Sequence, residues 1–190
     1  MRNRLALLLL ILFAVTSSGC TGSIVRDWLQ LREGKPQTQP ERRILAGRVV
    51  RVIDGDTVTV LDSNKTEKRV RLAGIDAPEA GQDFAQASKN HLSGLVFNME
   101  VEVLYSKLDQ YDRILGVLYV DGRNINLAQV RSGLAWHYKE YQSEQTQEER
   151  IAYTEAEERA REKRSGLWQQ PDPIKPSEFR RRARADTESR

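Results

Sequence analysis

Cysteine is the scarcest residue of this 190-residue chain, with Cys20 as the one example. A single cysteine excludes an intramolecular disulfide framework and a zinc site built from several thiolates. Lysine and arginine exceed aspartate and glutamate by only three, so there is no large positive field to hold polyanions. The apolar run Leu5–Val15 has eleven residues, well short of the roughly 20 that a membrane-spanning helix needs.

The rest of the composition is that of a soluble globular protein. Charged residues make up 30% of the chain and apolar residues 39%, which excludes a multi-span membrane protein and a fully disordered chain. Domains typically take roughly 100–200 residues. The length therefore fits one domain with appendages.

The N-terminal residues have the organisation of a secretory signal. Two arginines precede the apolar run Leu5–Val15, and small residues follow it as far as Gly19. Cys20 comes next, an arrangement that resembles a bacterial lipoprotein signal, in which cleavage leaves a lipidated cysteine as the first residue. The alternative is an ordinary secretory peptide with an idle cysteine. Loss of the two arginines would lower the formal charge from +3 to +1.

We therefore expect residues 1–19 to be a signal peptide and residues 20–43 a polar, proline-interrupted tether. Both alternatives predict export from a bacterial cytoplasm. A lipid on Cys20 would hold the protein stably on a membrane, at the cell envelope and, in a Gram-negative cell, at the outer membrane or in the periplasm. Without the lipid, the protein would be secreted.

From residue 44 the pattern changes to short alternating segments rich in β-branched residues, which indicate strands. Strands are expected at 49–53, 57–61, 68–75, 99–105 and 114–120. Helices are expected at 84–95, at 126–131 with Asn126 as cap, and after a capping box of Thr146 and Glu149. The expected fold class is mainly β with helices (α+β): a five-stranded OB-type Greek-key barrel packed with about three helices, spanning residues 44–170 as a monomer.

Residues 171–190 hold three prolines and then Arg180, Arg181 and Arg182. We interpret this segment as a solvated, disordered basic tail, with a weak electrostatic contact to nucleic acid as the minority alternative. Trp168, after the last expected helix, is expected to plug the core.

Three polar clusters interrupt the predicted barrel. Asp54-Gly55-Asp56-Thr57 fits a hairpin turn, yet a turn leaves Asp56 without a structural role. In the second cluster, Arg71 alternates with apolar neighbours, and Asp76 and Glu79 flank the strand-ending Pro78. These charges could simply neutralise one another on the surface. However, two carboxylates brought together need a cation or a proton, and calcium favours carboxylate and carbonyl oxygens.

The third cluster is Asp109-Gln110-Tyr111-Asp112-Arg113, which could be no more than a polar hairpin tip. Its arginine matters because hydrolysis of a phosphodiester builds negative charge on the nonbridging oxygens, and guanidinium groups match those oxygens with paired donors. Together the clusters contain a potential cation site, two arginines and a spare carboxylate, which phosphoryl transfer needs.

The segments Val52–Thr57, Arg71–Glu79 and Asp109–Arg113 resemble the three signature segments of the staphylococcal nuclease (thermonuclease) family. Gly133-Leu134-Ala135 and Gly166-Leu167-Trp168 are similar to later segments of that family. The resemblance covers about residues 44–170. It implies a nuclease that hydrolyses the phosphodiester bonds of DNA, RNA or both, leaving 3′-phosphates and 5′-hydroxyls.

The resemblance also implies a set of metal ligands. Asp56 and Asp76 would bind one Ca²⁺ through their carboxylates, and Ala77 would bind it through its backbone carbonyl. A carbonyl ligand does not depend on the identity of the side chain.

By the same resemblance, three side chains would carry the catalysis. Glu79 would be the general base or would orient the attacking water. Arg71 and Arg113 would bind the phosphate and stabilise the charge of the transition state. This chain has Gln110 and Asp112 where the family often has a basic residue and a glycine, a change expected to affect affinity more than chemistry.

Three tyrosines and two histidines are further polar or aromatic residues of interest. Tyr111, Tyr138 and Tyr141 are candidates for stacking on a base or bonding a phosphate, with surface tyrosines packed on the barrel as an equal alternative. His91 and His137 are expected to be packed or solvated histidines and not acid–base groups.

The rival function is that of a non-enzymatic OB binding module displayed on a membrane. An inert member would be expected to lose Arg71, Glu79 or Arg113, and all three are present.

Overall fold

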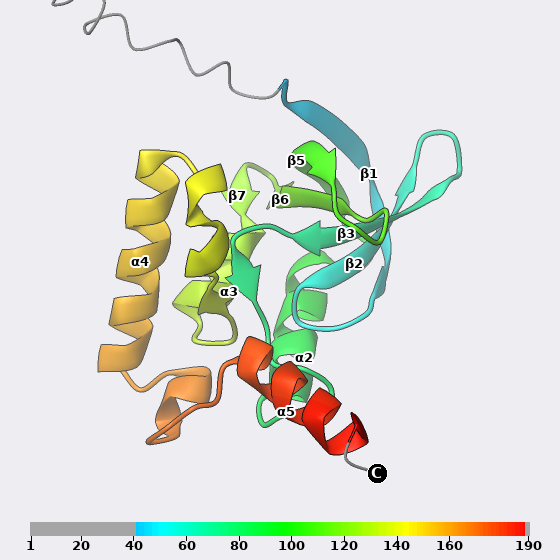
Figure 1. The fold of residues 1–190 in the computed structure, drawn as a ribbon. Helices are drawn as coiled ribbons and strands as arrows, with labels where there is room; N and C mark the ends of the chain where they lie inside the picture. Colours follow the sequence, from blue (N-terminus) through cyan, green and yellow to red (C-terminus); the bar gives the residue numbers. More distant parts are fainter. Residues whose placement is uncertain (1–40, 189–190) are drawn as a thin grey trace, which may run out of the picture. The chain divides into compact units, whose positions relative to one another are not determined.

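The computed structural model describes residues 41–188 (Figure 1). The predicted signal peptide and Cys20 lie outside the described residues. Between residues 41 and 188, no helix is long and apolar enough to cross a bilayer.

Five strands form a closed barrel. They are β1 (Arg43–Val52), β2 (Thr57–Asp62), β3 (Glu67–Leu72), β5 (Glu100–Leu108) and β6 (Ile114–Val120). The strands pair in the order β3-β2-β1-β5-β6, and a parallel pairing between β3 and β6 closes the barrel. The predicted OB-type barrel is confirmed.

The barrel forms because alternate residues of each strand point inward. The innermost side chains are fully buried and mostly β-branched: Val49, Val58, Val60, Val70, Val103 and Leu118. Side chains of this kind fit a pleated, half-buried surface, and burying each one stabilises the fold by about 1.5–3 kcal/mol. Apolar residues therefore recur along the strands in the sequence because these side chains form the core.

Within residues 41–188, four α-helices accompany the barrel, one more than expected: α2 (Ala85–Val96), α3 (Ile125–Arg131), α4 (Gln147–Glu162) and α5 (Pro176–Glu188). Helix α3 lies between α2 and α4 (Figure 1). The predicted capping box at the start of α4 is present, with Thr146 and Glu149 bonding each other's backbone N–H. Short elements complete the fold: β4 (Ile75–Asp76), β7 (Arg123–Asn124), β8 (Trp136–His137), and the 3₁₀ helices η1 (Lys139–Glu144) and η2 (Gly166–Gln169).

The predicted strand 68–75 is broken at Leu72. Gly74 takes a positive φ of 73°, which a glycine adopts without strain, and turns the chain out of the barrel. The chain resumes as β4, in which Ile75 pairs with His137 of β8. The break matters because it gives Asp76 a backbone partner outside the barrel.

The predicted cap of the second helix was wrong by two residues. Asn124 caps α3 by accepting a hydrogen bond from the Leu127 N–H at 2.9 Å. Asn126 is instead fully buried, and its Nδ2 donates to the carbonyls of Ala73 and Gly116. It therefore ties the turn after β3 to β6.

The interpretation of residues 171–190 as a disordered tail does not match the described structure, which has α5 from Pro176 to Glu188. Proline is favoured in the first turn of a helix because its missing N–H needs no partner there. The arginines and alanines that follow are good helix formers. The proline cluster therefore introduces a helix here.

Gly133 and Gly166 bring the chain after α3 against the chain after α4. The Leu167 N–H donates to the Gly133 carbonyl at 2.8 Å, and a Cβ on Gly133 would lie 2.2 Å from the Ser165 carbonyl oxygen. Trp168, 6% exposed, packs edge-to-face on Trp136 with ring centroids 4.3 Å apart. Trp168 is therefore buried as expected, but in a cluster with Trp136, Ala160 and Leu167 that is separate from the barrel core.

Replacing Gly133 by alanine is expected to lower the free energy of unfolding by about 3 kcal/mol, because the new methyl group meets backbone and the φ of 66° becomes strained. Gly122→Ala is the matched control, since Gly122 has a φ of 74° but open space around it, and it should cost about 1 kcal/mol. Urea unfolding followed by circular dichroism measures both. Equal losses would contradict the steric argument.

Candidate active site

The loop between β1 and β2 holds Asp56 in a fixed position. The Asp56 N–H donates to Asp54 Oδ1 at 3.0 Å. A Cβ on Gly55 would lie 1.9 Å from Ser88 Oγ, so only glycine lets the loop pack this closely on α2. The Gly55 carbonyl accepts a hydrogen bond from Gln129 Nε2 at 2.7 Å. The loop is therefore anchored by two helices.

The candidate metal ligands converge on this loop. Asp56 Oδ2 accepts a hydrogen bond from the Ala77 N–H at 2.7 Å. Arg71 joins the two acids: its Nη1 lies 2.5 Å from Asp56 Oδ2, and its Nη2 lies 2.9 Å from Asp76 Oδ1. Asp56 and Asp76 are only 5% and 2% exposed. Residues from β3, β4 and the β1–β2 loop thus form one buried charged cluster.

Burial dominates the electrostatics of this cluster. Desolvation raises the pKa of Asp56 to about 7, although the Arg71 guanidinium and the Ala77 N–H act in the opposite direction. Burial would lower the pKa of Arg71, but Asp56 and Asp76 together raise it, so the guanidinium stays charged. Two buried acids that share one arginine form a site that favours additional positive charge.

Arg71 also has donor capacity to spare. Its Nη1 is buried and, among residues 41–187, has no hydrogen-bond acceptor of suitable geometry, although it lies close to Asp56. Each terminal guanidinium nitrogen carries two N–H groups, and the contact with Asp56 does not use both. An incoming anionic oxygen could accept from the other.

The chemistry of the donor set fits calcium. In the part of the chain from 41 to 187, no three His, Cys, Asp or Glu side chains gather closely enough to hold an ion. A cation at Asp56 and Asp76 would therefore need backbone carbonyls and water as additional ligands, which calcium accepts readily. Ala77 contacts Asp56 through its backbone N–H, which donates to Asp56 Oδ2.

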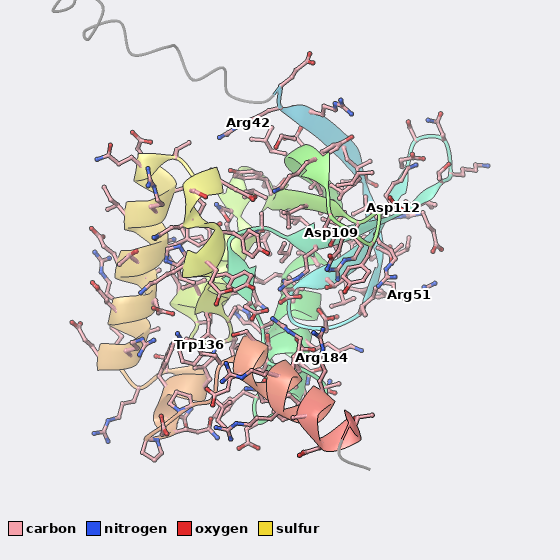
Figure 2. All side chains as sticks on the ribbon, in the orientation of Figure 1. Arg42, Arg51, Asp109, Asp112, Trp136 and Arg184 are labelled. Carbon is pink, nitrogen blue, oxygen red and sulfur yellow. The ribbon has the colours of Figure 1, made fainter. Side chains whose placement is uncertain are left out.

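Arg113 is held within its own turn. Its Nε and Nη2 both lie 2.7 Å from Asp109 Oδ2, and its N–H donates to Asp109 Oδ1 at 3.0 Å. Asp109 is thus the acid that restrains Arg113. Asp112 forms no ion pair with Arg113 in the described structure; it is exposed, with a φ of 57°. Figure 2 shows Asp109 and Asp112 in the loop between β5 and β6.

One cavity of about 690 Å³ brings these groups together. Its lining includes the candidate residues Asp56, Arg71, Glu79, Arg113, Tyr111, Tyr138 and Tyr141. Both arginines therefore face the same space as Glu79 and Asp56, although Arg71 lies in β3 and Arg113 in the loop before β6. Guanidinium groups are therefore available to an anion that enters the cavity.

The three tyrosines lie at the rim of the cavity. Tyr111 and Tyr141 are 63% and 49% exposed, and the Arg113 guanidinium lies 5.3 Å from the centroid of the Tyr111 ring. The rings of Tyr138 and Tyr141 are 5.0 Å apart. Partial burial raises the pKa of Tyr138 to about 12, so it stays a neutral hydrogen-bond donor. Exposed rings that line this cavity suit stacking on a base.

Both histidines are packed into the fold, as expected. His91 bonds Gln129 and Ser132 through its two ring nitrogens. His137 is 4% exposed, and its Nε2 is bonded to Gln145 Oε1 at 2.9 Å. Neither histidine is among the residues that line the cavity.

The structure adds residues that the sequence analysis missed. Arg180 of α5 reaches Asp76 and Glu79, and Gln129, fully buried, holds the Asp56 loop. A glutamine within the apolar segment 125–131 was a visible signal, because a buried amide needs partners. Arg180 gave no comparable signal within its run of arginines.

Several known proteins that are similar to this chain are named as nucleases or endonucleases. Residues 69–170 match the family described as "Staphylococcal nuclease homologue". A Haemophilus influenzae protein named "Uncharacterized endonuclease" is 44% identical over 70% of this chain and 72% of its own length. An Escherichia coli protein of the same name is 43% identical over 72% of this chain and 85% of its own. A Shigella flexneri "Micrococcal nuclease" is 40% identical over 74% and 83%. The chain therefore belongs to the staphylococcal nuclease homologue family.

Proposed function

We propose that this protein is a calcium-dependent nuclease that hydrolyses phosphodiester bonds of DNA, RNA or both, leaving 3′-phosphates and 5′-hydroxyls. Membership of the nuclease family supports the reaction class. The observation that carries the proposal is the single cavity that Asp56, Arg71, Glu79 and Arg113 line together. A binding module would have no need for a carboxylate beside two arginines.

The cation would be held by the carboxylates of Asp56 and Asp76 and the carbonyl of Ala77, with water completing the shell. When bound, calcium supplies positive charge that attracts the phosphate and offsets the negative charge of the transition state.

The chain's own groups perform the remaining steps. Glu79 takes a proton from the water that attacks phosphorus, or holds that water in line. Arg71 donates its spare Nη1–H to a nonbridging oxygen. Arg113 binds the same phosphate and stabilises the 5′ oxygen as its bond to phosphorus breaks, and that oxygen takes a proton from solvent water to become the 5′-hydroxyl. Asp109 keeps the Arg113 fork oriented toward the cavity.

Chelation is expected to abolish the activity. The full chain incubated with a labelled DNA duplex should cleave it in calcium, stop when the chelator EGTA is added in excess, and recover when calcium is restored. End-group labelling of the products should find phosphate on the 3′ ends. Cleavage that persists in the chelator, or products with 5′-phosphates, would contradict the proposal.

We also propose that the protein is exported and anchored to the cell envelope through Cys20. The supporting observation is the placement of Cys20 directly after the apolar run and small residues. Metabolic labelling with a fatty acid in a bacterial host should mark the wild type and leave Cys20→Ala unlabelled. Equal labelling of the two proteins would rule out this anchor.

A further inference from the structure

Helix α5 docks beside the candidate active site through a small number of contacts. Gln82 Nε2 donates to the Ile174 carbonyl at 2.5 Å, and Gln170 Nε2 donates to Asp83 Oδ2 at 2.6 Å. Pro176, the first residue of the helix, is buried. Figure 1 shows α5 running along the side of the molecule that carries α2. These contacts hold the start of α5, whereas its residues 181–187 are exposed.

Arg180 extends from this helix into the cluster of acids. Its Nη1 and Nη2 lie 3.2 Å and 3.1 Å from Asp76 Oδ1 and Oδ2, a two-pronged pairing. Its Nη1 also hydrogen-bonds to Glu79 Oε1. Paired charged hydrogen bonds of this kind are the strong ones. One guanidinium therefore engages both a candidate metal ligand and the candidate base.

The same oxygens cannot serve two cations equally well. Asp76 Oδ1 already accepts from Arg71, and Arg180 takes the remaining capacity of Oδ1 together with Oδ2. A calcium ion on this carboxylate would bring another positive charge onto oxygens that a guanidinium holds, and like charges repel strongly in a buried site. Arg180 also lines the cavity that the substrate would enter.

We propose that Arg180 is an internal competitor for the cation, so that calcium binding at Asp76 displaces it and loosens α5. The inference rests on the proposed function, because it takes Asp76 to be a calcium ligand. Coupling between two sites is reciprocal. A docked α5 therefore lowers calcium affinity, and bound calcium lowers the stability of α5 on the domain.

Calcium affinity tests the first half of this coupling. Isothermal titration of the full chain should show calcium binding about tenfold more tightly to Arg180→Ala than to the wild type. Arg182→Ala is the matched control, since Arg182 lies on the same helix but pairs with Glu178 at the surface, and it should bind calcium as the wild type does. Arg180→Lys keeps the positive charge without the planar fork, and its calcium affinity should lie between those of the wild type and Arg180→Ala.

Amide hydrogen exchange tests the second half. In the wild type and in Arg182→Ala, calcium should increase exchange in the peptide that covers residues 176–187. In Arg180→Ala the same peptide should exchange rapidly before calcium is added, and calcium should change it little. If Arg180→Ala acted only by removing a positive charge near the site, it would change the calcium affinity but not the amide exchange of residues 176–187.

The possible results separate this inference from the proposed function. Calcium binding of equal affinity in the wild type and Arg180→Ala, with no change in α5 exchange, would overturn the competition and leave the proposed nuclease intact. Calcium that protects α5 from exchange would likewise overturn it. A failure of all these proteins to bind calcium would overturn the inference together with the calcium dependence.

Discussion

Replacing Glu79 by glutamine is expected to lower kcat for DNA cleavage by about 10²–10⁴-fold, the usual contribution of a positioned acid–base group. Glutamine has nearly the same shape but cannot take a proton from water. Glu79 is partly exposed at the cavity, and its N–H bonds the Gln82 side chain at 3.1 Å. The fold should therefore survive, with a circular dichroism spectrum close to that of the wild type, and calcium should bind at least as tightly as it does to the wild type.

Two further variants isolate the cause of that loss. Glu155→Gln removes an exposed acid that pairs with Arg159 on α4, and it should leave kcat unchanged. Glu79→Gln also weakens the contact to Arg180, so the double variant with Arg180→Ala is informative. If the loss comes from the missing base, the double variant stays inactive. Recovery of activity in the double variant would instead trace the loss to the position of Arg180.

The barrel was predictable because its signal is local. Alternating β-branched residues such as Val58 and Val60 report the buried face of one strand without reference to any other. The capping box of Thr146 and Glu149 is equally local, since both residues lie within one turn of α4. Features whose partners are a few residues away can be inferred from the sequence.

The convergence of the site depends on long-range packing. Ala77 and Asp56 are 21 residues apart in the chain, and Arg180 and Asp76 are 104 apart. The resemblance to a family suggested the first pair, because both residues lie in its signature segments. No pattern inside the run of arginines distinguishes Arg180 from Arg181, and only the docking of α5 selects the one that faces the acids.

The cluster Asp109–Arg113 shows a different limit to what can be predicted from the sequence. Asp109 and Asp112 lie within four residues of Arg113, and charge alone does not decide which acid pairs with it. The backbone decides: the N–H groups of Tyr111 and Arg113 both point at Asp109 Oδ1. Burial would raise the pKa of Asp109, but these hydrogen bonds and Arg113 lower it overall. Asp109 therefore stays charged beside Arg113.

Replacing Arg71 by lysine is expected to lower kcat by about 10²–10³-fold, the range seen when one donor to a transition-state oxyanion is removed. Lysine keeps a positive charge between Asp56 and Asp76, so the buried acids stay neutralised and the domain should fold. It lacks the planar fork, however, and its three N–H groups leave from one nitrogen, so they cannot span the two acids and a phosphate oxygen as Nη1 and Nη2 do. The loss should therefore appear in the chemical step.

Single-turnover cleavage of an oligonucleotide at saturating calcium measures that step without product release. Arg69→Lys is the matched control, because Arg69 lies on the same strand with its side chain exposed, and it should cleave at the wild-type rate. Arg71→Ala should behave differently again: it leaves Asp56 buried without its arginine partner, although Arg180 still pairs with Asp76, and it should lose about 3–5 kcal/mol of stability. If Arg71→Lys folds, binds calcium and cleaves as fast as the wild type, the phosphate contact belongs to Arg113, and Arg71 serves only to hold the two acids together.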